Sequence, residues 1–300
     1  MDNKFNFSSK FRVANIFSLI LFVTSVLFIL FKGLNYGIDF KGGTLIELRA
    51  SSTGASEIRT ALNKMDLGDV NVKNFGQEGD YLIKVEQKES DGNKIIPQIK
   101  ENLSENLKTE INFRRVENVG PKVSSELLQS GIIAISLSLA AMLFYIWIRF
   151  EWQFSIGSII ALFHDVVITL GIFSVLSLEI NLSIIAAVLT IVGYSMNDTV
   201  VIYDRIRENL NKFNRLNIKE IADLSINDTL ARTIITSVTT LLALLSIFIL
   251  GGEILKGFSF AMILGVVIGT YSSIFVASPM LKFFKVTYKT LEKEEEKIVP

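Results

Sequence analysis

Six long apolar stretches constrain this 300-residue chain more than any other feature. A helix that crosses a membrane needs about 20 mainly apolar residues to span roughly 30 Å of hydrocarbon. Six segments meet that requirement, so the sequence predicts a polytopic α-helical membrane protein with six transmembrane helices. The predicted spans are residues 13–31, 131–148, 154–177, 181–203, 232–252 and 257–284.

The segment after the first span has the opposite character. Residues 32–130 hold 14 of the chain's 30 Lys and Arg residues and 15 of its 30 Asp and Glu residues. Nearly half of all charges therefore lie in a third of the chain, which indicates a hydrophilic insert. The first span has a basic start, but no small-residue cleavage site follows it. We therefore expect an uncleaved membrane anchor.

The short connections predict the orientation. Lys and Arg gather in the N-terminal tail 1–12, the connection 204–231 and the C-terminal tail 285–300. The connections 177–181 and 251–257 hold a single lysine between them. Cytoplasmic loops of membrane proteins carry the excess of Lys and Arg. We therefore expect both termini in the cytoplasm and the insert on the outer side.

Hydrophobic periodicity predicts the elements of the insert. The expected order is strand 44–50, helix 53–65, strands 69–75 and 80–86, helix 95–107 and strand 111–119. This β-α-β-β-α-β order is typical of the ferredoxin-like arrangement. The insert has no histidine and no phosphate-binding glycine loop before a helix. We interpret it as a docking or substrate-contact module.

Composition excludes several classes of function. With no cysteine, the chain can form no disulfide, iron–sulfur cluster or thiolate zinc site, and its single histidine argues against a His-rich metal site. A net charge of zero gives no support for nucleic-acid binding. The sequence contains no G-x-x-x-x-G-K-[ST] loop for ATP. We expect no cofactor and no metal.

Polar residues at membrane depth are the candidates for function, because charges there are costly and usually mark ion or substrate pathways. In the fourth span, helical spacing puts Asp198 on one face with Thr190, Tyr194 and Asn197. We hypothesise that Asp198 and Arg232, at the start of the fifth span, form a proton-relay site. The alternative is that Asp198 only hydrogen-bonds a neighbour and holds the bundle together.

Further polar residues in the spans are candidates for supporting that site. Asp165 either takes part in the pathway or only fixes helix packing. For His164, a hydrogen-bonded residue of the bundle is a simpler interpretation than a proton relay. Gly265 and Gly269 predict close helix packing. The predicted supporting seam comprises Asn197, Tyr194, Thr199, Thr236, Thr239, Thr240, Asp165 and His164.

Several motifs resemble one known family. In order along the chain, they are Gly37–Thr44, Val119–Lys122, Leu162–Asp165, Gly193–Asn209 and Arg232–Thr240. They resemble the SecF branch of the RND-related SecD/SecF family, whose members are accessory subunits of the bacterial Sec protein translocase. The first motif marks the start of the outer domain and contains Asp39, Phe40, Gly42 and Gly43.

This resemblance implies a function that periodicity alone does not give. It implies pairing with SecD into a twelve-span unit that works with YajC and the SecYEG channel. It implies use of the proton-motive force to promote preprotein translocation across the bacterial inner membrane, with the insert in the periplasm. In that picture Asp198 carries the proton and Arg232 is its ion partner. The chain would not be an enzyme.

Two other functions stay open. One is a half-size RND-type exporter of small molecules or lipids, which the modest size of the insert disfavours. The other is a structural scaffold of the translocon, which predicts that the polar seams tolerate isosteric substitution. Lost export at normal abundance in Asp198→Asn would exclude the scaffold.

Overall fold

The computed structural model describes residues 5–50, 53–65, 67, 70–85, 92–107, 111–213 and 215–291. Parts of the predicted segments lie outside these residues. They are residues 1–4 of the N-terminal tail, residue 69 at the start of one expected strand, residue 86 at the end of another, residue 214 of the predicted connection 204–231, and residues 292–300 of the C-terminal tail.

Six helices among the described residues are long and apolar enough to cross a membrane, which confirms the prediction of a polytopic helical membrane protein. Five are single helices, and the sixth joins α9, a π-helical turn η1 and α10. Their bounds are α1 Phe11–Phe31, α5 Pro121–Arg149, α6 Trp152–Val175, α7 Leu182–Lys212, α8 Ile218–Leu250, α9 Gly252–Ser272, η1 Ser273–Ala277 and α10 Ser278–Phe283.

Three of these helices, α5, α7 and α8, extend nine or more residues beyond the predicted spans. The predicted connection 204–231 is mostly helical, since α7 runs to Lys212 and α8 begins at Ile218. Hydropathy detects only the part of a helix that is apolar enough for lipid, whereas helical hydrogen bonding continues into water. The start of α8 is fixed by a capping box in which Asn217 and Glu220 bond each other's backbone N–H groups.

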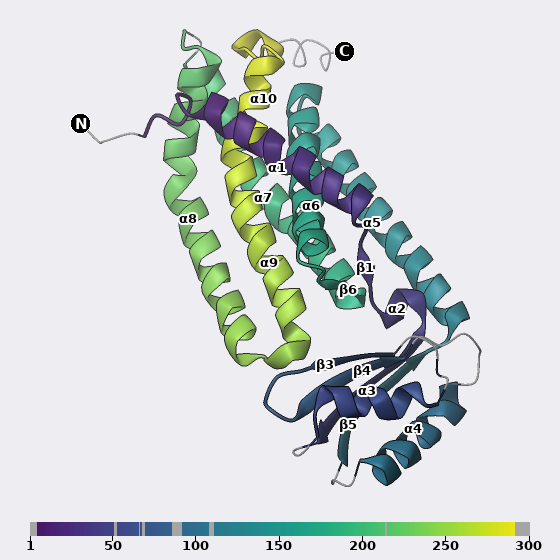
Figure 1. The fold of residues 1–300 in the computed structure, drawn as a ribbon. Coiled ribbons are helices and arrows are strands. Elements are labelled where there is room, and N and C mark those ends of the chain that lie inside the picture. The colour runs from purple at the N-terminus through teal and green to yellow at the C-terminus, as the bar shows by residue number, and fades with distance from the viewer. Residues whose placement is uncertain are drawn as a thin grey trace.

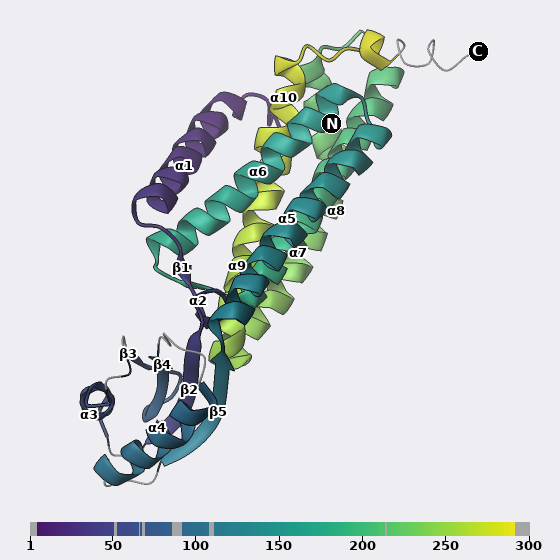
Figure 2. The same ribbon diagram turned by 90° about the vertical axis from the view of Figure 1, so that its right-hand side faces the viewer.

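Three helices form the centre of the bundle and three lie at its periphery (Figures 1 and 2). About half of the apolar window is buried in α6, α7 and the α9–α10 span, against 11–17% in α1, α5 and α8. Gly265 and Gly269 of α9 meet Ile191 and Ser195 of α7, and a Cβ at Gly269 would lie 3.0 Å from Ser195. Small residues thus allow the close packing that their spacing predicts.

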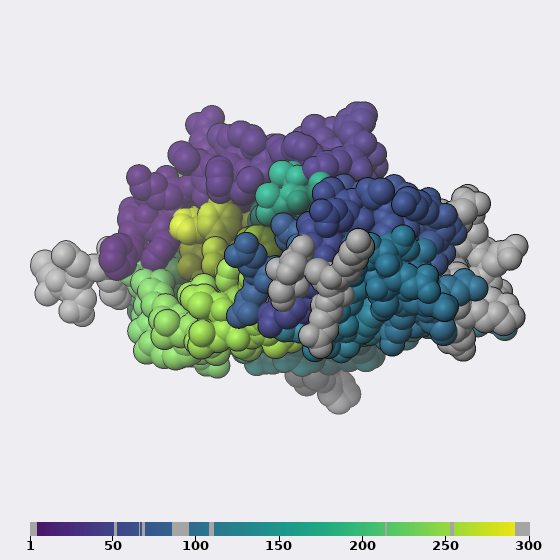
Figure 3. All heavy atoms as spheres, turned by 60° about the horizontal axis from the view of Figure 1, so that its bottom comes forward, coloured from purple at the N-terminus to yellow at the C-terminus, as the bar shows by residue number. Residues whose placement is uncertain are grey.

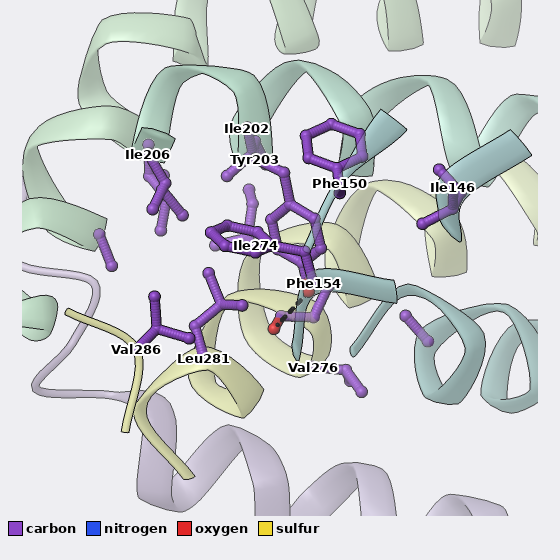
Figure 4. Close-up of a cluster of buried hydrophobic side chains, with 14 of the residues drawn as sticks. Ile146, Phe150, Phe154, Ile202, Tyr203, Ile206, Ile274, Val276, Leu281 and Val286 are labelled. Carbon is purple, nitrogen blue, oxygen red and sulfur yellow. Dashed lines mark hydrogen bonds between the residues drawn. The ribbon is translucent and has the colours of Figure 1, made fainter. Parts of the chain in front are cut away.

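A cluster of buried hydrophobic side chains joins α7 to η1 and α10, and Phe150, Phe154 and Tyr203 are its aromatic members (Figure 4). The rings of Phe154 and Tyr203 meet edge to face at 5.1 Å, and both side chains are fully buried. The Tyr203 hydroxyl donates a hydrogen bond to the Ala277 carbonyl at 2.9 Å. This contact satisfies the buried hydroxyl and ties α7 to the turn η1.

The insert folds into a four-stranded antiparallel sheet covered on one face by two helices. Its sheet order is β3-β4-β2-β5. Ile46, Leu48 and Ile83 of the sheet are completely buried together with apolar residues of both helices. The bounds are β2 Gly43–Ala50, α3 Ala55–Asn63, β3 Val70–Asn74, β4 Asp80–Val85, α4 Gly92–Asn106 and β5 Ile111–Val119.

A small junction joins this outer domain to the bundle. The strand β1, Asn35–Tyr36, pairs in parallel with β6, Glu179–Ile180, in the turn between α6 and α7. A single-turn helix α2, Ile38–Lys41, then leads into the sheet. The domain lies at one end of the bundle, and the α7–α8 connection and α10 lie at the other (Figure 1).

Candidate functional site

Asp198 lies on the inward face of α7 and is only 3% exposed. The hydroxyl of Thr270, on α9, lies 3.5 Å from its Oδ2 atom, at the outer limit of a hydrogen bond. The hydroxyls of Thr270 and Ser237, on α8, are 2.7 Å apart. Within the described part of the chain, no cation lies within 4.0 Å of Asp198. The carboxylate is therefore buried among hydroxyls without a fixed countercharge.

Arg232 makes no ion pair with Asp198 in this structure, so the hypothesis that the two residues act together stays a prediction. The Arg232 side chain lies on the exposed face of α8 and makes no ion pair with the described residues.

Asp165 is completely buried, and its carboxylate has three side-chain partners. Its Oδ2 atom accepts hydrogen bonds from Ser195 of α7 at 2.5 Å and Ser272 of α9 at 2.7 Å. Its Oδ1 atom lies 2.8 Å from Nδ1 of His164. One carboxylate on α6 thereby connects the three central helices.

Two buried polar atoms next to this centre make no hydrogen bond to the described residues. They are Nε2 of His164 and the hydroxyl of Tyr194. Unpaired buried polar atoms are costly and call for an explanation in each case. Both lie on residues of the predicted seam.

Other members of that seam do not gather at Asp198. Thr199 is buried, and its hydroxyl lies 3.0 Å from that of Ser273 in η1. Asn197 and Thr239 are exposed, whereas Thr236 and Thr240 are half-buried. The hydroxyls of the three α8 threonines bond carbonyls of their own helix. The side of α8 that carries Thr239 thus faces away from the bundle, and Thr236 and Thr240 are only partly exposed.

The residues of the first motif lie at the junction. Asp39 accepts a hydrogen bond from the backbone N–H of Leu182, and Phe40 is 7% exposed. Gly42 has φ of +79°, and a Cβ there would lie 3.3 Å from the Val119 carbonyl oxygen. Glycine is therefore required at this close approach.

The sequence analysis missed part of the polar centre. Ser195, Ser272, Thr270 and Ser237 all bond, directly or through one another, with the two aspartates. Ser195 precedes Asp198 by three residues, so helical spacing alone could have placed them on one side. The part played by α9 could not be found in this way, because it depends on which helices are neighbours.

Chemically, the site offers two buried carboxylates and a chain of hydroxyls that can donate or accept. Among the described residues, no group of three His, Cys, Asp or Glu side chains could hold a metal ion. Such an arrangement suits proton uptake and release, and its rigid hydrogen bonds to Asp165 also suit helix packing.

Comparison with known families identifies the family to which this chain belongs. The profile described as "Protein export membrane protein SecD/SecF, C-terminal" matches residues 99–287, and the "SecD/SecF GG Motif" matches residues 27–53. The chain belongs to the SecD/SecF family. This family consists of protein-transport components of bacterial membranes rather than classical enzymes.

Individual members of the SecD/SecF family are similar to this chain over most of its length. Protein translocase subunit SecF of Rickettsia bellii is 46% identical over 282 residues, which are 93% of each chain. The SecF of Vibrio alginolyticus is 44% identical over 275 residues, covering 90% of this chain and 86% of that one. The resemblance found in the motifs is thus confirmed over nearly the whole sequence.

The fold is also similar to solved SecDF structures. SecDF of Thermus thermophilus, described as a translocon-associated membrane protein, superposes with a TM-score of 0.85 at 36% identity. The match covers 95% of this chain but only 39% of that one. A second SecDF structure, in a form called super-membrane-facing, gives a TM-score of 0.70 at 35% identity. This chain therefore corresponds to a part of the SecDF protein.

Proposed function

We propose that this chain is the SecF-type subunit of the Sec translocase accessory complex. It pairs with SecD and uses the proton-motive force to promote preprotein translocation across the bacterial inner membrane. SecYEG and YajC are its further partners. Family membership supports the role in export, and the match to 39% of a SecDF chain supports a partner that supplies the remainder.

The observation that carries the energy coupling is the environment of Asp198. A carboxylate that is 3% exposed, with one hydroxyl at 3.5 Å and no cation within 4.0 Å among the described residues, breaks no strong contact when it takes up a proton. One charge moving across the membrane potential is worth about 2.3 kcal/mol per 100 mV. In this proposal Asp198 carries the proton, and Asp165 with His164 supports it from α6.

The exposed face of α8 supports the pairing with SecD. Arg232, Thr239 and Ser246 lie on a membrane-spanning helix yet face outward. Polar groups in a bilayer normally face protein or a water-filled cavity rather than lipid. We assign this face to the contact with SecD, where Arg232 would approach the proton site as its ion partner.

We also propose that the outer domain is a ferredoxin-like periplasmic domain and that both termini are cytoplasmic. The sheet order β3-β4-β2-β5 with two helices on one face supports the fold assignment. Arg149 is the last residue of α5, and Arg205 and Arg207 lie near the end of α7. The α7–α8 connection is at the end of the bundle opposite the sheet (Figure 1), which supports the orientation by the positive-inside rule.

The test is a pulse-chase of preprotein maturation in cells whose only copy carries Asp198→Asn. We expect maturation to slow about tenfold or more, as for loss of an essential proton-transfer group, at normal abundance and with normal SecD co-purification. Asp204→Asn is the matched control. It is the same substitution on the same helix, but its carboxylate is exposed and pairs with Arg149 at 2.8 Å. Normal maturation in Asp198→Asn would refute the proposal.

A further inference from the structure

The outer domain is fastened to the first residues of α7. The Oδ2 atom of Asp39 accepts a hydrogen bond from the backbone N–H of Leu182 at 2.9 Å, across 143 residues of sequence. Leu182 is the first residue of α7. The backbone N–H of Ile184, two residues further on, donates a hydrogen bond to Oδ1 of Asn181 at 3.1 Å. Asp39 thus supplies one of the caps of a helix to which it does not belong.

Two further contacts hold the same turn. The backbone N–H of Gly37 donates to the Ile180 carbonyl at 2.8 Å and extends the β1–β6 pairing. Lys84, in the sheet strand β4, forms an ion pair with Glu179. A Cβ at Gly37 would lie 2.6 Å from Oε1 of Glu179, so a larger residue would displace this pair.

Phe40 anchors the junction on the apolar side. Its ring belongs to the buried cluster that contains Ile184 and Ile191 of α7 and Val266 of α9. The residue beside Asp39 is therefore packed with the central helices rather than with the core of the outer domain.

Away from these contacts, the domain does not pack continuously on the bundle. A cleft of about 410 Å³ lies between the sheet and the helix ends, with Leu82 and Arg115 on one side and Phe173 and Asn181 on the other. Figure 3 shows the outer domain in blue beside the yellow-green turn that joins α8 and α9. The contacts of the junction, together with the chain that continues from β5 through Gly120 into α5, therefore set the position of the domain.

We propose that Asp39 is a positioning residue that makes the outer domain and the outer end of α7 move as one body. The same helix carries Asp198, sixteen residues and about 24 Å further along. A tilt or shift of α7 that accompanies a change at Asp198 is then passed directly to the domain. The consequence for export rests on the proposed function, whereas the mechanical link does not.

Two substitutions remove the same hydrogen bond from opposite sides. Asp39→Ala removes the acceptor. Leu182→Pro removes the donor, and proline is favoured at the first position of a helix. The preceding Asn181 has φ of −122° and ψ of −177°, an extended conformation that proline tolerates after it. Asp39→Asn is the matched control, because its amide oxygen can still accept the bond.

The link is measured as a distance in the complete chain together with its partner in lipid nanodiscs. This chain has no cysteine, so Glu105→Cys on exposed α4 and Leu255→Cys near the start of α9, away from the α8 face assigned to SecD, accept two spin labels selectively. Loss of a hydrogen bond to a carboxylate should raise the displaced population roughly tenfold. We expect this in Asp39→Ala and in Leu182→Pro, no further change when they are combined, and the original distribution in Asp39→Asn.

The outcomes separate the link from the proposed function. An unchanged distance distribution in both single variants overturns the link, and so does an additive effect in the combined variant. Displacement with normal preprotein maturation at normal abundance supports the mechanical link and overturns its consequence for export. Displacement with slowed maturation supports both. Asp198→Asn, measured in parallel, tests the proton site alone, since its failure leaves the distance result standing.

Discussion

The outer domain and the bundle both bury carboxylates, but they treat them differently. In the outer domain, Asp80 accepts two hydrogen bonds from Arg49, at 2.6 and 2.8 Å, and a third from Arg114 at 3.1 Å. In the bundle, Asp198 has a single hydroxyl at 3.5 Å. Asp165 has two serine hydroxyls and an imidazole that is charged only when protonated.

This difference separates a permanent charge from a changeable one. The hydrogen bond from Arg49 holds the pKa of Asp80 below its usual value, with smaller contributions from the charges of both arginines. Asp80 is therefore ionised whenever the domain is folded near neutral pH. Among the residues that the structure describes, Asp198 has no such partner, so no neighbour there holds its carboxylate in the ionised form.

The largest expected effect is that of Asp165→Leu. The change leaves the hydroxyl of Ser195 and one His164 nitrogen without their partner, while Ser272 keeps its bond to the Gly269 carbonyl. Each unpaired buried group costs about 1–3 kcal/mol, so we expect a loss of about 2 kcal/mol or more. Membrane abundance should also be low, measured by immunoblot beside thermal unfolding in detergent. Asp165→Asn keeps one acceptor and should retain most of the stability. Native stability in Asp165→Leu would show that Asp165 does not connect the helices.

Asp198→Leu should lose export but not stability. The leucine gives up only the long contact with Thr270 and removes a buried carboxylate that lacks a fixed cation, so thermal stability should be unchanged or higher. Preprotein maturation should fall as far as in Asp198→Asn. If unfolding shifts down as much as in Asp165→Leu, the contrast between the two bundle aspartates is wrong.

Asp80 should matter through acid stability. Because folding lowers its pKa, its contribution is complete above the unfolded value of about 3.9 and is lost as the pH falls through the lowered pKa. Hydrogen-exchange protection of β2 and β4 in the native protein should therefore decline steeply with acid. Asp80→Asn should begin with lower protection and show a shallower decline. Parallel acid curves would exclude the paired-charge interpretation.

The smallest effect is expected on the exposed face of α8. The hydroxyl of Thr239 bonds the Ile235 carbonyl of its own helix, so Thr239→Val should change stability by less than about 0.5 kcal/mol. Thr233→Val is the buried comparison, since the Thr233 hydroxyl has no partner in the described structure, and its removal should raise stability slightly. SecD co-purification should weaken only in Thr239→Val. Equal retention of SecD in both would move the contact to another face.

Much of the fold follows from local pattern. The six membrane helices and the order of elements in the outer domain appear in the sequence because hydropathy and periodicity are properties of neighbouring residues. The two-residue pairing of β1 with β6 does not, because it joins segments more than 140 residues apart. The end of α7 at Lys212 was missed because polar helices continue beyond lipid.

The sequence singles out Asp198 as a candidate, but it does not predict which side chains surround it. Asp198 stands out by its depth in a span, and the sequence identifies it. Helical spacing put Asn197 beside it, but the fold turns Asn197 outward and Ser195 inward. Which side of α7 meets α6 and α9 depends on long-range packing. The same packing makes Asp165 a centre of bonding, which its own sequence neighbourhood does not reveal.

The π-helical turn η1 has a geometric consequence for the whole sixth span. An α-helix advances about 100° per residue, so one additional residue in a turn rotates everything beyond it by that angle. Ser272, just before the turn, bonds Asp165, and the carbonyl of Ala277, at its end, receives the Tyr203 hydroxyl. The turn therefore changes which side of the span faces a given neighbouring helix. It lets one span present hydroxyls before the turn and an apolar face beyond it to neighbouring helices.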